Sequence, residues 1–225
     1  SDADLANWIN RTIEVIVSEQ GTSYGLGGLG GLKYRIAPAE DATTLDTDDL
    51  VWSVVPGRYL IYDNLLASAA GEFDVTNIPP VDGADIEIIF NGSGTTTAGF
   101  APEVYVDING ASTNLANVAH YGRTAANGAA GPTANGEFAW IRGSKTPGDI
   151  NESSFKSWFP EYANTTTHKS AHTRSGLLSS SSSTNSYVDS HVLSWKDTSA
   201  INRLRIFPGA DDFDANSRLK MWIIK

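Results

Sequence analysis

Short runs in which apolar and polar residues alternate recur along the chain beyond about residue 50. This period of two is that of a strand with one buried face. The runs with strand-like composition are residues 58–65, 84–90, 103–108, 137–142, 166–173, 186–195, 203–207 and 218–223. The pattern therefore predicts about eight strands in this part of the chain.

Turn residues separate these runs. Asn and Gly tolerate the positive φ angles that tight strand connections require, and Pro fixes φ at the start of a turn. The pairs are Asn91-Gly92, Asn109-Gly110, Asn127-Gly128, Asn135-Gly136 and Pro208-Gly209. Short strands joined by turns and some long connections predict an all-β fold, a jelly-roll-like antiparallel β-sandwich with a short N-terminal helical or mixed extension.

The N-terminal segment has a different period. Its apolar residues recur at helical spacing, and Ser1 or Asp2 can cap a helix there. They are Leu5, Trp8, Ile9, Ile13, Ile16 and Val17. A helix is the favoured interpretation, but residues 12–17 are mostly β-branched, so a strand stays open for the second half.

A glycine-rich stretch divides the chain. Residues 21–32 read GTSYGLGGLGGL, and each glycine loses much backbone entropy when it is fixed. An acidic stretch follows, and then residues 51–62 alternate like a strand interrupted at Pro56-Gly57. We therefore predict a docking extension with a linker over residues 1–50 and the β-sandwich over residues 51–225.

The composition of the chain argues against several classes of function. The 225 residues carry a net charge of −10 with only 16 Lys and Arg, which argues against a nucleic-acid partner because phosphate neutralisation needs clustered cations. The chain has no Cys, so disulfides and thiolate metal sites are excluded. No apolar run reaches the length of a membrane span, and the start is acidic, unlike a signal peptide. We expect a soluble protein made in the cytoplasm of its host, with no membrane insertion.

Two stretches match motifs for nucleotide binding and calcium binding, but each is better explained as a loop or a turn. Residues 25–30 match G-x-G-x-x-G, but no helix is predicted to follow them, so a loop is favoured over nucleotide binding. Asp212, Asp214 and Asn216 match the first half of a calcium loop. Ser217 replaces the expected glycine, and no bidentate Glu follows at the required distance. An acidic turn is favoured there.

The sequence contains no recognisable catalytic motif. His168 and His172 are four residues apart, but on a strand this spacing separates them by about 13 Å and prevents a shared zinc ion. No G-x-S-x-G elbow is present, and a carboxylate pair for glycoside hydrolysis cannot be identified among 26 acidic residues. We therefore expect no enzyme activity, no catalytic residues, no metal and no cofactor.

Three stretches of the chain together carry a resemblance to a known protein family. The first covers residues 71–79 (GEFDVTNIP) and continues as Asp85-Ile86-Glu87-Ile88. The second, residues 159–170, contains Tyr162 followed by T-T-x-x-K-S. The third, residues 200–208 (AINRLRIFP), is followed by Phe213 and Ser217-Arg218-Leu219.

These stretches resemble a family of jelly-roll-like structural proteins of tailed bacteriophages, described as tail-fibre, head-fibre or capsid-decoration proteins. The resemblance covers about residues 58–225, and the terminal pattern is its most specific part. The closing residues 221–225 (MWIIK) depart from the family's more usual "LYG" ending. Residues 1–50 are not covered, so the resemblance says nothing about attachment to a particle.

The resemblance implies a non-enzymatic structural protein on the virion exterior, a capsid-decoration (cement) or tail-fibre component that acts by subunit contacts. We expect a homo-oligomer, a trimer, with other capsid or tail proteins of the virion as partners. The apolar N-terminal face and the apolar end of the chain are the candidate assembly interface. Its residues are Leu5, Trp8, Ile9, Ile13, Ile16 and Trp222.

The alternative is a receptor-binding, lectin-like module that recognises a host surface glycan. Aromatic rings stack on the C–H faces of sugars, and the cluster around Trp158 and Tyr162 is the candidate contact. A third possibility is an appendage enzyme that depolymerises host polysaccharide.

Overall fold

The computed structural model describes residues 12–14, 33–38, 50–54, 56–95, 103–123, 127–133, 136–141, 153–177, 187–209 and 212–225. In these residues the regular structure is entirely strand. The strands are β1 (Thr12–Glu14), β2 (Lys33–Pro38), β3 (Leu50–Val54), β4 (Arg58–Leu65), β5 (Phe73–Val75), β6 (Asp85–Gly92), β7 (Glu103–Ile108), β8 (Leu115–Arg123), β9 (Asn127–Thr133), β10 (Glu137–Trp140), β11 (Ser153–Phe159), β12 (Lys169–Leu177), β13 (Tyr187–Trp195), β14 (Leu204–Pro208) and β15 (Arg218–Ile224). The described ranges contain no helix long and apolar enough to cross a membrane.

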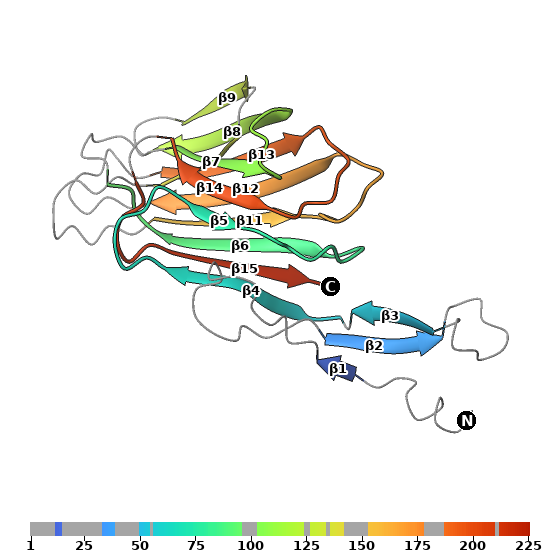
Figure 1. The fold of residues 1–225 in the computed structure, drawn as a ribbon. Helices are drawn as coiled ribbons and strands as arrows, with labels where there is room; N and C mark the ends of the chain where they lie inside the picture. Colours follow the sequence, from blue (N-terminus) through green and yellow to red (C-terminus); the bar gives the residue numbers. More distant parts are fainter. Residues whose placement is uncertain are drawn as a thin grey trace, which may run out of the picture.

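Two antiparallel sheets form a β-sandwich (Figure 1). The larger sheet has eight strands in the order β4-β15-β6-β11-β12-β13-β8-β9. The smaller sheet has four strands in the order β10-β7-β14-β5. This arrangement confirms the predicted all-β sandwich.

The strand pairs are nested as in a jelly roll. β4 pairs with the last strand, β15, and β5 pairs with β14. Further inward, β6 pairs with β11, and β7 pairs with β10. The chain therefore runs as one long folded-back hairpin whose successive pairs alternate between the two sheets, which is the jelly-roll topology.

Four strands are additions to this eight-strand framework. β8 and β9 lie in sequence between β7 and β10, and β12 and β13 lie between β11 and β14. Both pairs join the larger sheet beyond β11, and β10 packs against β12 and β13. The larger sheet is therefore extended on one side by four strands that have no counterparts in the four-stranded smaller sheet.

The N-terminal segment forms a separate sheet of β1, β2 and β3. Residues 12–14 are a strand, so for them the alternative interpretation is confirmed and the favoured helix is wrong. Ile13 pairs with Tyr34 in this sheet. Residues 50–54 pair with β2, and the first strand of the sandwich, β4, begins at Arg58. The interface candidates Leu5, Trp8, Ile9 and Ile16 lie outside the described residues.

The turn signals have mixed outcomes. Asn109 and Gly110 have φ angles of 54° and 79° and form the tight turn that their sequence predicts after β7. Asn91-Gly92 forms the last two residues of β6, and Asn127-Gly128 forms the first two of β9. Both pairs are still paired with neighbouring strands, so they mark strand ends and are not themselves turns.

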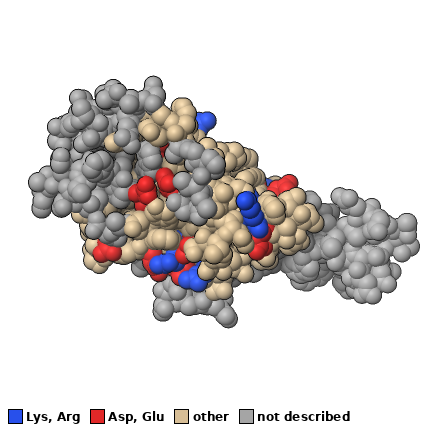
Figure 2. All heavy atoms as spheres, turned by 90° about the horizontal axis from the view of Figure 1, so that it is seen from above, with Lys and Arg blue, Asp and Glu red and all other residues tan. Residues whose placement is uncertain are grey.

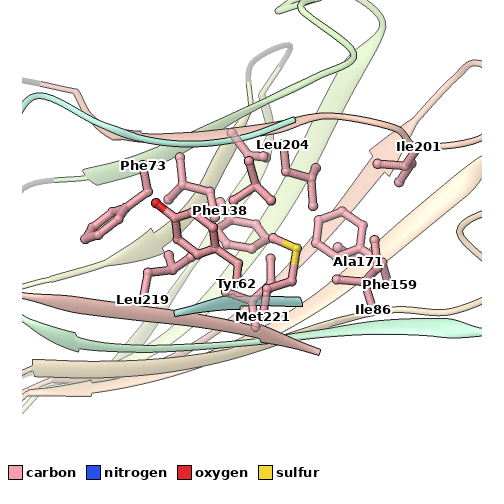
Figure 3. Packing of buried hydrophobic residues seen from close by; sticks show 14 of the residues in the cluster. Tyr62, Phe73, Ile86, Phe138, Phe159, Ala171, Ile201, Leu204, Leu219 and Met221 are labelled. Carbon is pink, nitrogen blue, oxygen red and sulfur yellow. The ribbon is translucent and has the colours of Figure 1, made fainter. Parts of the chain in front are cut away.

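The core fills the space between the sheets (Figure 3). Phe73 and Leu204 of the smaller sheet face Leu219 and Met221 of the larger sheet. At one end, Phe90 is in aromatic contact with Phe73, Phe155 and Phe213, at ring-centroid distances of 6.2, 4.9 and 5.2 Å. Aromatic contacts of this kind stabilise beyond the area they bury.

Replacing Phe90 by Ala should lower the free energy of unfolding by about 3–5 kcal/mol, because it opens a cavity among the core rings. Urea denaturation followed by tryptophan fluorescence measures the loss. Leu65→Ala is the control, since Leu65 is 54% exposed and its truncation should change stability by less than about 0.5 kcal/mol. Equal losses in the two variants would contradict the core assignment.

Candidate functional site

The three stretches that carry the family resemblance meet in space. The backbone N–H of Ile78 donates to the carbonyl oxygen of Asn202 at 2.9 Å. The backbone N–H of Ile201 donates to the carbonyl oxygen of Tyr162, also at 2.9 Å. The Tyr162 hydroxyl donates to the carbonyl oxygen of Pro79. Residues far apart in the sequence thus form one junction that fastens three connections of the sandwich.

Arginine side chains lock this junction on the outer face of the smaller sheet. Arg203 donates to both carboxylate oxygens of Asp74, at 2.9 and 2.7 Å. Arg205 pairs with Glu72 and, at 3.1 Å, with Asp107. In the structure their carboxylates come from the same chain and join β14 to β5 and β7.

Tyr162 has a structural role in the sandwich. Its side chain is buried, and its hydroxyl accepts a hydrogen bond from the backbone N–H of Val81 at 3.2 Å. The ring is therefore not available to a ligand at the surface, and Tyr162 does not share a surface with Trp158. We retain only Trp158 as a contact candidate from this cluster.

The rest of the T-T-x-x-K-S motif also shapes the chain. The Asn164 side-chain oxygen accepts the backbone N–H of Thr166 at 2.7 Å. Lys169 is buried, and its ammonium group donates to the carbonyl oxygens of Thr167 and Thr198 at 2.8 and 3.2 Å. Burial lowers the pKa of Lys169. The motif therefore builds a turn and ties it to the connection after β13.

The calcium-like motif is a turn before β15. The carboxylate of Asp214 accepts the Ser93 hydroxyl at 2.8 Å, and Asn216 has a φ angle of 68°. In the part of the chain that the structure describes, no group of three or more His, Asp and Glu side chains is placed to share a metal ion.

A buried polar cluster, which no sequence motif reveals, lies on the inner face of the added strands β12 and β13. The Ser175 hydroxyl donates to Asp189, whose second carboxylate oxygen is 2.8 Å from Nε2 of His191. A hydrolytic triad needs the histidine between the serine and the acid, but here the acid is in the middle. Less than a tenth of each residue is exposed. This order and burial favour a structural role.

The outer face of the larger sheet carries a row of mostly apolar and aromatic residues, with Glu87 among them. Strand register places successive members opposite each other, from β4 at one edge to β8. The row is Leu60, Trp222, Glu87, Trp158, His172, Val192 and Val118. Trp158, Val192 and Val118 are 43%, 43% and 48% exposed. Large apolar side chains in contiguous exposed positions indicate a contact surface.

Trp158 and Trp222 are held differently within this row. The indole N–H of Trp158 donates to the carboxylate of Asp85 at 2.9 Å. The guanidinium carbon of Arg58 lies 4.0 Å from the centre of the Trp222 ring, a cation–π contact. Trp222 is thereby partly covered within its own chain, and its role in assembly stays a prediction.

Glu87 joins the charges between the two tryptophans. Its carboxylate pairs with Arg58 and with Lys156. Burial of Glu87 opposes its ionisation, but hydrogen bonds and charge attraction from the two cations outweigh this effect and lower the pKa of Glu87. On the face seen in Figure 2, acidic and basic side chains lie beside one another in small groups.

Comparison with known proteins gives no relative on which to base a function, because no protein-family model and no curated protein matches the chain. The resemblance to phage structural proteins therefore stays a prediction from the sequence.

Tyr162→Phe should lower the free energy of unfolding by about 1–3 kcal/mol, because it leaves buried backbone groups of Pro79 and Val81 without their hydroxyl partner. Chemical denaturation measures the effect. Tyr105→Phe is the control, since its hydroxyl bonds to the exposed side chain of Glu103. A loss in the control as large as that in Tyr162→Phe would refute the assignment.

Glu87→Gln should destabilise the protein by about 1 kcal/mol at neutral pH, because the Arg58 and Lys156 contacts lose their charge. The lowered pKa of Glu87 means that its ionised form stabilises the fold above the unfolded-state pKa of about 4.3. This contribution disappears as the pH falls through the lower folded-state pKa. The gap between wild type and variant should therefore close below about pH 4.

Denaturation midpoints measured across this pH range test the closing gap. Asp82→Asn is the control, because Asp82 is exposed and its contact with Lys225 is through its backbone carbonyl. A gap of constant size for Glu87→Gln would show that the charge of Glu87 does not stabilise the fold.

Proposed function

We propose that this chain is a non-enzymatic structural protein on the exterior of a tailed-phage virion, a capsid-decoration or fibre component that acts by subunit contacts. The family resemblance of residues 58–225 supports this proposal. The jelly-roll topology is consistent with it, since the same topology occurs in capsid and lectin domains. A fold alone does not assign a function, so stronger support comes from how the chain is divided.

One observation supports the proposal best. In the described residues, β1, β2 and β3 pair with one another, and no strand pairing joins them to the sandwich. The sandwich from β4 to β15 has its first strand paired with its last and needs no strand from the extension. A chain divided in this way suits a protein in which one part attaches and the other part is displayed.

Attachment through the extension would use its apolar residues. The proposed contact residues are Leu5, Trp8, Ile9, Ile13 and Ile16. Burial of one such large side chain against another subunit contributes about 1.5–3 kcal/mol. A symmetric trimer brings three copies of this segment together, so the contribution of each residue is repeated at every interface. Other virion proteins, of the capsid or the tail, are the proposed partners.

A variant that begins at Pro56 should keep the cooperative unfolding of the sandwich but should not be incorporated into virions. Chemical denaturation and near-ultraviolet circular dichroism check the fold. Incorporation is measured by quantitative immunoblotting of particles purified from an infection complemented with each variant. Full-length Leu65→Ala is the matched control and should be incorporated normally. Normal incorporation of a folded truncated chain would overturn the docking role of the extension.

A further inference from the structure

We propose that the outer face of the larger sheet binds a carboxylate-bearing polysaccharide at a patch centred on Trp158. The Trp158 patch consists of Trp158, Lys156, His172, Arg174 and Glu87, on the neighbouring strands β6, β11 and β12. This inference goes beyond the structural role proposed above and depends on different residues. It names the surface site that would contact a glycan and the class of sugar that would bind there.

The indole of Trp158 provides a fixed stacking surface. The ring is 43% exposed, although its N–H is bound to Asp85. Asp85 is itself held by the backbone N–H of Glu161 at 2.9 Å. Because the polar atom of the indole is already satisfied, the exposed remainder is an apolar ring. Such a ring stacks on the C–H face of a pyranose sugar.

Two cations lie beside this ring. Lys156 and Arg174 are direct partners on β11 and β12, one row away from the Trp158 and His172 pair. Residues two apart on a strand are separated by about 7 Å, so a sugar stacked on Trp158 can direct a ring carboxylate between the two cations. The ring and the charges therefore match one acidic sugar unit.

Arg174 makes this position favourable for an anion. Lys156 is paired with Glu87, whereas Arg174 has no ion pair with any residue of the described ranges. Like charges directly opposite each other on a sheet are destabilising. An anion between them replaces this repulsion by attraction. Arg174 can also form a bidentate contact with a carboxylate.

The whole face has the charge that such a ligand needs. Among the strand residues whose side chains the structure describes, the charged groups on this face are five cations, Arg58, Lys156, Arg174, Arg218 and Lys220, and three carboxylates, Asp63, Asp85 and Glu87. The complete chain carries a net charge of −10. A locally positive face on an acidic protein attracts anions to that face and away from the rest of the surface.

A second copy of the chain fits this face less well. Two copies packed through the same face would bring the cations of each Trp158 patch toward those of the other. The outer face of the smaller sheet is the alternative partner surface, but there Asp74 and Glu72 are already paired with arginines. Charge complementarity therefore favours an external polyanion, and the stacking ring favours a saccharide.

Isothermal titration calorimetry of the full chain with oligogalacturonate tests the proposal. The matched ligand control is the methyl-esterified oligomer, which keeps the sugar rings and removes the charge. We expect binding to the acid form that weakens with added salt, and binding to the ester at least about tenfold weaker.

Trp158→Ala and Arg174→Gln should each weaken binding of the acid form, by about tenfold for the ring. Lys196→Gln is the control, because Lys196 is exposed and lies after β13, outside the patch. Circular dichroism and thermal unfolding check that each variant is folded, and Arg174→Gln keeps the test valid if Trp158→Ala does not fold.

Three results would overturn the proposal: no binding of oligogalacturonate, equal binding of acid and ester, or unchanged affinity in both patch variants. Sedimentation velocity provides a further arm. Self-association that is lost in Trp158→Ala and Arg174→Gln would assign the patch to contacts between copies of the chain and would also overturn the saccharide assignment.

Discussion

Antiparallel pairing between the beginning and the end of the sandwich is the constraint on which the rest of the structure depends. β15 lies between β4 and β6, and β14 lies between β5 and β7. Both sheets are therefore completed by strands from the last part of the chain. The ion pairs of Arg203 with Asp74 and of Arg218 with Asp63 join the same strands. With these pairings in place, the inner faces are aligned and the aromatic core is enclosed.

The residues of the three stretches that carry the family resemblance help to hold the beginning and the end of the sandwich together. Arg203 from the third stretch binds Asp74 from the first, and Tyr162 from the second contacts Pro79 and Ile201 from the other two. These residues are a signature of how the chain closes and not of what it binds. The outer face of the larger sheet is largely independent of this junction. A protein of this fold can therefore change its surface without changing its signature.

Much of the fold could be predicted from the sequence, but the particular strands could not all be found. Alternation marked β4, β7 and β13, because most of their inward positions are apolar or aromatic. It missed β11, whose inward residues Ser153 and Ser157 are polar and are satisfied by buried hydrogen bonds. The expected number of sandwich strands was close to the framework number partly because β12 and β13, which are additions, replaced β5 and β11. The outer row depends on register, which joins positions of six strand pairs and cannot be read from one sequence.

The nested topology also affects the order in which the chain can fold during synthesis. β4 is the first sandwich strand to be synthesised, but its partner in the sheet, residues 218–224, is the last. Until then β4 and β6 each have an unpaired edge facing the gap that β15 will fill. Contacts between such distant residues form slowly, and open strand edges can pair with other chains. Nascent chains are thus exposed to misassociation until the last sandwich strand has been made, and a holdase chaperone that covers strand edges would raise the yield of folded protein.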